Sequence, residues 1–159
     1  HATDSAMWNR IITTNLTGCF LTLRAGLRAM RDAGSSPGRL IAISSIMGLA
    51  GYRYASAYSA SKHGVIGLVT SLAAELEGSG ITANALCPGY LDGEMTERSL
   101  ATIMAKTGKS RDEAVAVLAS MSPGCRLIRP QEVSAAALQL CAEGSQHVTG
   151  RAISINAET

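Results

Sequence analysis

A tyrosine and a lysine in the stretch YSASK, Tyr58 and Lys62, have the types and spacing needed for acid–base chemistry. Because side chains four residues apart share a helix face, a helix here would place the phenol beside the ammonium. A phenol with its ordinary pKa near ~10 is a poor base at neutral pH, but a fixed cation nearby lowers that pKa. Such a phenol can exchange a proton with a carbonyl or an alcohol. Taken alone, the same spacing also fits an ordinary surface pair.

Ser45 is a candidate to act with Tyr58 on one substrate oxygen. It ends the run RLIAISS at residues 39–45, whose continuous hydrophobicity predicts a parallel strand with both faces covered. Ligands of open α/β sheets bind at the carboxyl ends of the strands, and the predicted Tyr58 helix follows after a turn. A hydroxyl at the strand end and a phenol in the next helix could therefore hold one oxygen atom together. The alternative for Ser45 is a helix or turn cap.

Two further features accompany this pair. Asn15 is in line with Ile11 and Cys19 on the apolar stripe of the first predicted helix, where an amide without hydrogen bonds costs about 1–3 kcal/mol. It is either a functional residue or a structural asparagine bonded to neighbouring backbone. Pro88 and Gly89 follow a second buried strand, and glycine lets a ligand approach the backbone closely. The alternative for these two residues is a simple strand terminator.

Helices and strands are expected to alternate along the chain. Apolar spacing predicts helices over residues 7–31, 57–77, 92–107, 110–121 and 130–141, and strands over residues 39–45, 81–87 and 151–156. This alternation predicts an α/β fold in which three strands form a parallel sheet with flanking helices. We expect residues 1–159 to form a single partial domain that begins directly in a helix.

Composition excludes several classes of function. The formal net charge of +2 is too small to indicate a nucleic-acid or membrane partner, and no stretch approaches the roughly 20 apolar residues of a membrane span. The four cysteines form no CxxC pair and no Cys/His cluster with zinc spacing, so we expect no metal site. We interpret the cysteines as the reduced thiols of a cytoplasmic protein.

Five segments in order resemble the short-chain dehydrogenase/reductase family: NLTGCF from Asn15, ISSIMG around Ser45, YSASK, NALCPG and VTGRAISIN. The resemblance covers nearly the whole chain. It implies the carboxyl-terminal part of a doubly wound, Rossmann-like parallel sheet. It also implies reversible hydride transfer between NAD or NADP and a small-molecule carbonyl or alcohol substrate, with the cofactor carrying the hydride. The sequence does not distinguish NAD from NADP or fix the direction of the reaction.

The resemblance also implies roles for individual residues. Tyr58 would be the general acid/base, Lys62 would lower its pKa and hold the nicotinamide ribose, and Ser45 would orient the substrate carbonyl. Asn15 would hold a water that links Lys62 to solvent. The nicotinamide would be bordered by Pro88, Gly89, Leu91 and Gly93, and the substrate would contact Ser45, Met47, Tyr90 and Met95.

Two departures from the family pattern affect these expectations. Gly93 stands where family members often have a threonine that bonds the nicotinamide carboxamide; Thr96 is a possible substitute. The chain has no GxxxGxG phosphate turn, which in the family lies in the first βα unit. A catalytically incompetent fragment that serves as a binding or assembly module is therefore the alternative function. A bare edge on the strand at residues 39–45 would invite aggregation, so we expect a dimer or tetramer, or a missing amino-terminal segment, to cover it.

Residues 90–126 are predicted to form a substrate lid. Its methionine and aliphatic side chains can adapt to an apolar chain, and the segment resembles that of 3-oxoacyl and 3-hydroxyacyl thioester reductases more than that of sugar reductases. Four basic residues could meet the phosphates of an acyl carrier or coenzyme A: Arg98, Lys106, Lys109 and Arg111. The alternative is an ordinary solvated helix surface.

Overall fold

A parallel sheet of three strands forms the centre of the fold, in the order β1-β2-β3. The computed structural model describes residues 3–122 and 124–155, in which the strands are β1 (Gly38–Ile43), β2 (Ile81–Pro88) and β3 (Ala152–Ile155). β2 lies in the middle of the sheet and is buried along its whole length, so its sequence is mostly apolar and its two polar residues, Thr82 and Asn84, are buried as well. The predicted α/β class and parallel sheet are confirmed, although Asn156 of the predicted last strand lies outside the described residues.

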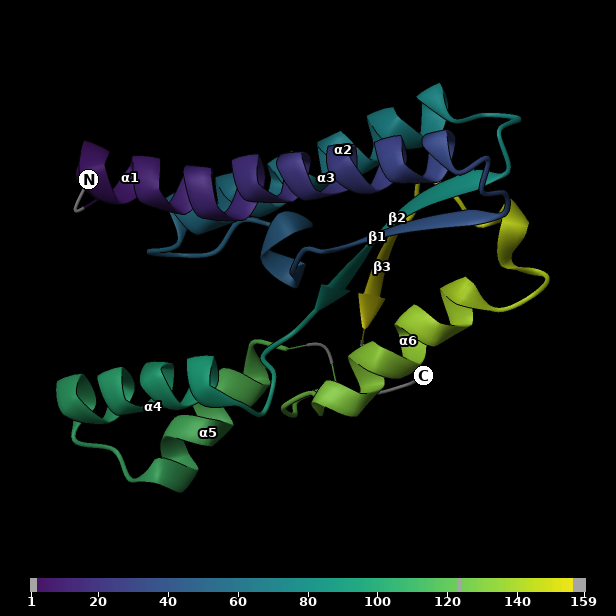
Figure 1. Cartoon of the computed structure of the whole chain (residues 1–159). Helices are drawn as coiled ribbons and strands as arrows, with labels where there is room; N and C mark the ends of the chain where they lie inside the picture. Colours follow the sequence, from purple (N-terminus) through teal and green to yellow (C-terminus); the bar gives the residue numbers. More distant parts are fainter. Residues whose placement is uncertain (1–2, 123, 156–159) are drawn as a thin grey trace.

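Two long helical segments cover one face of this sheet (Figure 1). The first consists of α1 (Ser5–Ile12), a π-helical turn at η1 (Thr13–Thr17) and α2 (Gly18–Asp32). It begins at Asp4, whose side chain accepts a hydrogen bond from the amide of Met7 at 2.7 Å and so caps the helix. The second segment is α3 (Ser56–Glu75). The first predicted helix is therefore interrupted by a π-helical turn that periodicity does not reveal.

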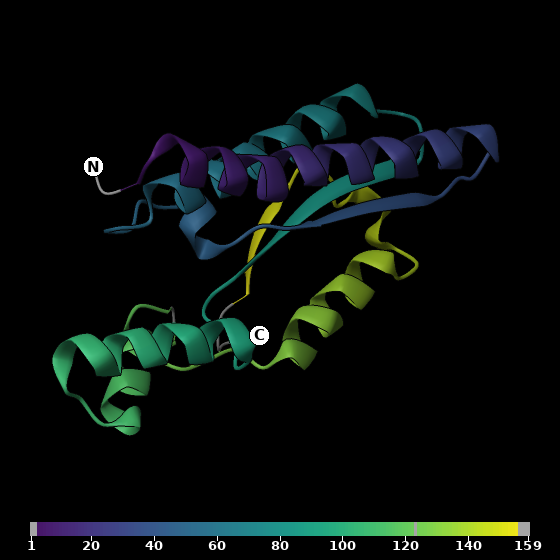
Figure 2. The same ribbon diagram turned by 60° about the vertical axis from the view of Figure 1, so that its left-hand side comes forward.

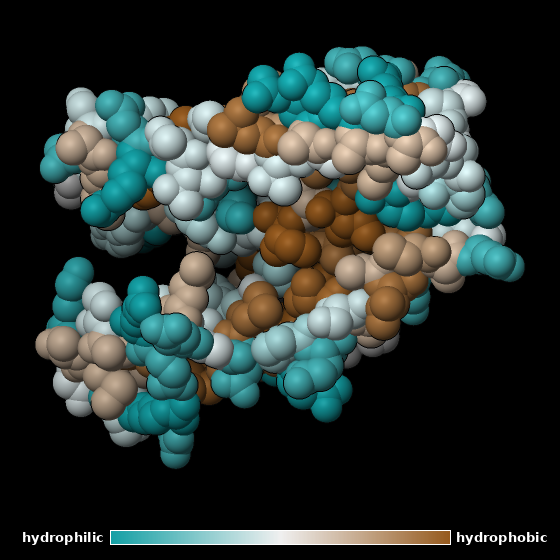
Figure 3. Space-filling view, in the orientation of Figure 1, coloured by the Kyte–Doolittle hydropathy of each residue, from teal (hydrophilic) through white to brown (hydrophobic). Residues whose placement is uncertain are grey.

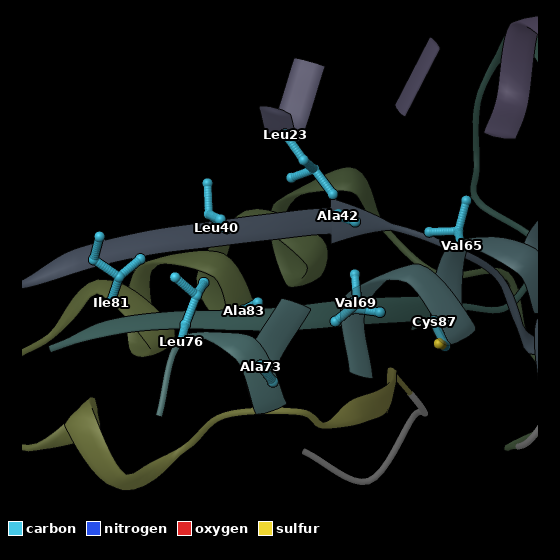
Figure 4. Packing of buried hydrophobic residues seen from close by; sticks show 11 residues of the cluster. Leu23, Leu40, Ala42, Val65, Val69, Ala73, Leu76, Ile81, Ala83 and Cys87 are labelled. Atoms are coloured by element: carbon cyan, nitrogen blue, oxygen red, sulfur yellow. The ribbon is translucent and has the colours of Figure 1, made fainter. Parts of the chain in front are cut away.

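The core between these helices and the sheet is aliphatic and rich in alanine (Figure 4). Leu23 of α2 packs toward β1, while α3 supplies Val65, Val69 and Ala73. These side chains meet the inward-facing residues of the strands: Leu40, Ala42, Ile81, Ala83, Ala85 and Cys87. Small residues on both layers let the helices approach the sheet closely, so few aromatic residues are needed.

α6 (Pro130–Cys141) covers the opposite face of the sheet (Figure 2). Proline at its first position suits a helix start, because that amide has no partner within the helix. The side chain of Glu132 accepts hydrogen bonds from Arg126 and Arg129 at the same helix end. Leu140 then packs with Leu86 in a second buried cluster.

A helical hairpin extends beyond the carboxyl ends of the strands and consists of α4 (Glu94–Thr107) and α5 (Arg111–Ser120). α4 ends at Gly108, whose φ of 69° is the left-handed conformation that glycine adopts at little cost. A capping box begins α5, with Ser110 and Glu113 each bonded to the other's backbone. Two short 3-10 turns complete the described chain: η2 (Ile46–Gly48) and η3 (Ser145–His147).

The outer edge of β1 lies beside apolar surface. Among the described strands β1 pairs with β2 alone, and Ile43 at its end is 49% exposed. Figure 3 shows hydrophobic surface in the middle of its view, between the upper helices and α6. What covers this edge stays a prediction. Within residues 3–122 and 124–155, no helix combines the length and apolar character needed to cross a bilayer.

Candidate active site

The predicted site residues gather around one cavity of about 640 Å³ at the carboxyl ends of the strands. Its walls come from the end of β1, η2, the start of α3, the segment after β2 and the first turn of α4. Figure 3 shows a deep notch between the upper helical layer and the α4–α5 hairpin. Asn15 does not line the cavity, whereas the other predicted residues do: Ser45, Met47, Tyr58, Lys62, Pro88, Gly89, Tyr90, Leu91, Gly93 and Met95.

Ser45 and Tyr58 both line the cavity, and the Ser45 hydroxyl lies near enough to the phenol to lower its pKa. Ser45 lies directly before η2, and its hydroxyl oxygen also accepts a hydrogen bond from the amide of Met47 at 3.1 Å. The capping alternative for this serine is therefore confirmed, while its action on a substrate oxygen stays a prediction. A carbonyl oxygen entering the cavity beside these hydroxyls could accept a hydrogen bond from both.

The pKa of Tyr58 is raised in this structure, and the expected lowering by Lys62 is wrong for it. Burial of the phenol raises the pKa, and the hydrogen bond from Ser45 lowers it by a smaller amount. The Lys62 ammonium lies over the Tyr58 ring, 5.6 Å from its centre. Desolvation therefore sets the direction of the Tyr58 pKa, and the phenol stays protonated at neutral pH.

Lys62 is bound to the end of β1. Its ammonium donates a hydrogen bond to the carbonyl of Ile43 at 3.0 Å, which keeps it at the cavity wall. Burial lowers the pKa of Lys62, while Cys19 and Cys87 nearby oppose that shift. Burial in turn raises the pKa of both thiols, so they are neutral and unreactive at neutral pH. All four cysteines are free thiols.

Asn15 does not line the cavity but is connected to Tyr58 by hydrogen bonds through Ser61 of α3. Its amide donates to the hydroxyl of Ser61 at 3.1 Å, and Ser61 donates to the carbonyl of Tyr58 at 2.7 Å. This asparagine lies in the π-helical turn, a local distortion frequent at functional sites. Its side chain thus has the structural partner that the sequence left open, and the expected bound water stays a prediction.

The segment after β2 has one tight glycine and one with free space around it. A β-carbon on Gly89 would lie 2.9 Å from the Ser122 hydroxyl oxygen, so packing against Ser122 requires glycine here. A β-carbon on Gly93 would meet no atom within 4 Å, and its φ of 176° suits any residue. Thr96, buried on the first turn of α4, also lines the cavity. The sequence identified Gly89 as important but not the neighbour that makes it so.

Sequence reasoning missed the contribution of α1 to the site. Met7 and Ile11 of α1, together with Thr3 just before it, line the cavity. Met7 and Ile11 are four residues apart and in line with Asn15, so the helical spacing that placed Asn15 could have found them. Tyr54 lies at the rim and is 98% exposed.

Two of the four basic residues that the sequence offered for carrier phosphates are already paired. Arg98 contacts Glu94 and Arg111 contacts Glu97, each at 2.5 Å between a guanidinium nitrogen and a carboxylate oxygen. These pairs are largely exposed and therefore contribute little to stability. They favour the ordinary solvated surface over a phosphate site at Arg98 and Arg111.

The residues present fit the nicotinamide end of a dinucleotide. Tyr58, Lys62 and Gly93 all line the cavity, and a β-carbon on Gly93 would meet no atom within 4 Å, so this end of the cavity offers a hydroxyl, an ammonium and open space. The described residues contain no glycine-rich strand-to-helix turn for a pyrophosphate. The fit thus concerns the reactive end of the cofactor.

The fold and site together define a Rossmann-like α/β protein with a serine–tyrosine–lysine site. The family model described as Enoyl-(Acyl carrier protein) reductase matches residues 1–157. The chain belongs to the short-chain dehydrogenase/reductase family, as its sequence motifs predict.

Named relatives agree with this assignment. The chain is 36% identical over 149 residues to 3-oxoacyl-(acyl-carrier-protein) reductase of Salmonella typhimurium, covering 94% of this chain and 56% of the relative. It is 33% identical over 150 residues to D-beta-hydroxybutyrate dehydrogenase of Rhizobium meliloti, covering 94% and 57%. It superimposes on actinorhodin polyketide ketoreductase with NADPH at a TM-score of 0.89 and 33% identity, covering 98% and 59%. The chain thus spans a little more than half the length of these proteins.

Proposed function

We propose that the protein catalyses reversible hydride transfer between NAD or NADP and a carbonyl or alcohol substrate. The observation that carries this proposal is that Ser45, Tyr58 and Lys62 line the wall of one cavity, with the Ser45 hydroxyl acting on the pKa of the phenol. A hydroxyl, a phenol and an ammonium are what carbonyl reduction requires to hold an oxygen and supply its proton. The bound nicotinamide would supply the hydride.

The chain's own residues would bind the substrate oxygen and move its proton. Ser45 and Tyr58 would hold the carbonyl oxygen, and the Tyr58 hydroxyl would give its proton to that oxygen as negative charge develops on it. The raised pKa of Tyr58 keeps the phenol protonated at neutral pH, which favours the direction of carbonyl reduction. Lys62 would hold the ribose, and its bond to Ile43 limits where the ammonium can reach.

We infer a 3-oxoacyl or 3-hydroxyacyl thioester as the substrate class. The mouth of the cavity is lined by flexible apolar side chains, among them Met7, Ile11, Met47 and Met95. The names of several relatives refer to ketoacyl or oxoacyl reduction, which supports the same class. The pairing of Arg98 and Arg111 leaves Lys106 and Lys109 as the lid cations for a carrier phosphate.

The proposed activity also needs a partner for the edge of β1. We propose that a preceding segment of the same protein, or a second copy, covers this edge and the apolar surface beside it. The alternative of an inert binding module is not favoured, because the relatives are dehydrogenases and reductases and the site residues converge on one cavity.

Absorbance of the reduced nicotinamide tests the proposal directly. The full-length protein is mixed with NADH or NADPH and a short 3-oxoacyl thioester. A simple ketone and a keto sugar serve as comparison substrates. Tyr58→Phe should lower kcat by about 10²–10⁴-fold, the range of general acid catalysis, while Tyr52→Phe should keep the activity. Absence of oxidation with every substrate and both cofactors would overturn the proposal.

A further inference from the structure

Ser44 connects three parts of the site although it is almost completely buried, with 2% exposure. Its hydroxyl donates to the carbonyl of Lys62 at 2.9 Å, and its amide donates to the carbonyl of Leu86 at 2.7 Å. Ser44, which directly precedes Ser45, is therefore bonded both to the backbone of Lys62 on α3 and to the backbone of Leu86 near the end of β2.

A second buried hydroxyl holds the other end of the same segment. Ser59, which follows Tyr58, donates to the carbonyl of Met47 at 2.7 Å and is 7% exposed. Residues 44–47, which include Ser45, are thus bonded to α3 at both ends. The two attachment points on α3, Ser59 and Lys62, both lie within the helical turn that follows Tyr58. We refer to the hydroxyls of Ser44 and Ser59 as the serine clasp.

η2 packs against α3 too closely for any side chain at residue 48. A β-carbon on Gly48 would lie 2.6 Å from the Ser44 hydroxyl oxygen and 2.8 Å from the carbonyl oxygen of Lys62. Both contacts are closer than real β-carbons approach such atoms, so η2 can rest against α3 only because residue 48 is glycine. The segment is therefore held by directional bonds on a closely packed surface.

We propose that Ser44 and Ser59 are positioning residues that hold Ser45 within hydrogen-bond reach of Tyr58 and fix Lys62 relative to the end of β2. Hydrogen bonds weaken steeply with distance and angle, so a small displacement of residues 44–47 would weaken the bond between Ser45 and Tyr58. A displacement of about 1 Å can cost on the order of 100-fold in rate. Neither serine side chain is required to touch substrate or cofactor. The effect on catalysis rests on the proposed function, whereas the effect on Tyr58 does not.

The experiment compares Ser44→Ala and Ser59→Ala with Ser79→Ala in the full-length protein. Ser79 is the matched control, because its hydroxyl donates to Leu76 at 2.6 Å in the turn after α3, at the far end of the sheet. The readout is the ultraviolet difference titration of Tyr58, taken as the signal that disappears when Tyr58→Phe is introduced into each background. It is accompanied by thermal unfolding and by kcat and KM.

Both clasp variants should raise the pKa of Tyr58, because the Ser45 bond that lowers it is weakened. The other ionisable groups near this phenol, Lys62 and Tyr90, are unchanged in all variants. Ser79→Ala should reduce the unfolding temperature and leave the Tyr58 titration as it is. For active protein, kcat should fall about 10-fold to 100-fold in the clasp variants, with a smaller change in KM.

An unchanged Tyr58 titration in folded Ser44→Ala or Ser59→Ala would overturn the proposal. If one of these two variants does not fold, the Tyr58 titration of the other still tests the proposal. The phenol titration needs no turnover, so a protein without oxidoreductase activity would refute the proposed function and still give a result for the clasp.

Discussion

The ammonium of Lys62 donates a 3.0 Å hydrogen bond to the carbonyl of Ile43, so the lysine is bound to the end of β1 while lying over the ring of Tyr58. The spacing of Tyr58 and Lys62 suggested that the lysine both lies beside the phenol and sets its pKa, and the structure shows only the first of these. The lysine remains near the phenol and helps to form the cavity, yet burial sets the direction of the Tyr58 pKa. The protonation state of the site therefore follows from desolvation.

The first prediction concerns pH. Because the pKa of Tyr58 is raised, carbonyl reduction should stay level through neutral pH and decline only in the alkaline range, as the phenol loses the proton it must donate. Alcohol oxidation needs the phenolate, so its kcat/KM should rise with pH across the neutral range. Cofactor KM should increase toward alkaline pH as Lys62, whose pKa is lowered, loses its charge. A plateau of the oxidation profile at neutral pH would contradict the raised pKa.

Gly93→Thr should strengthen cofactor binding. The position has space for a side chain, faces the cavity and has an extended backbone. One added hydrogen bond to the nicotinamide amide is worth about 0.5–1.5 kcal/mol, which corresponds to a decrease in Kd of roughly 2-fold to 10-fold. Calorimetric titration with NADH and NADPH measures it.

Gly93→Val is the control, since valine has the shape of threonine without its hydroxyl. Equal tightening by both variants would show that the hydroxyl makes no bond to the cofactor. Threonine and glycine are similar as helix N-caps, so α4 should keep its stability in the threonine variant.

Thr82→Val should stabilise the protein. The Thr82 hydroxyl oxygen on β2 is buried and has no hydrogen-bond partner within the described part of the chain. A buried hydroxyl without a partner costs about 1–3 kcal/mol, and valine preserves the shape and suits a strand. We expect the free energy of unfolding in urea to increase by about 1 kcal/mol. Thr82→Ser, which keeps the hydroxyl and removes a methyl group, should decrease it, and a loss of stability in the valine variant would sink the idea.

Gly48→Ala should destabilise the protein and impair the site together. The new methyl group would meet the Ser44 hydroxyl and the Lys62 carbonyl at distances that force residues to move, at a cost of about 1–3 kcal/mol. Gly51→Ala in the same loop is the matched control, because a β-carbon there meets no atom within 4 Å. Chemical unfolding and kcat measure both effects. Equal stability of the two variants would show that η2 can shift away from α3 without loss.

Local order along the chain was predictable because it depends on neighbours in sequence. The stretch ITANALC at residues 81–87 predicted a buried strand, which β2 is, and the spacing of Tyr58 and Lys62 predicted a shared helix face. The capping box at Ser110 could likewise be read from four residues. The π-helical turn around Asn15 could not, because it breaks the regular period on which such predictions depend.

The sequence by itself determined the order of helices and strands, the carboxyl-terminal edge where the site lies and the residue types available there. Only the tertiary structure decided that Tyr58 has a raised pKa, that Lys62 bonds to Ile43, that Gly89 packs on Ser122 and that α1 supplies a wall of the cavity. The reason is physical. Periodicity and capping are properties of adjacent residues, whereas desolvation and close contact depend on atoms brought together from distant segments of the chain.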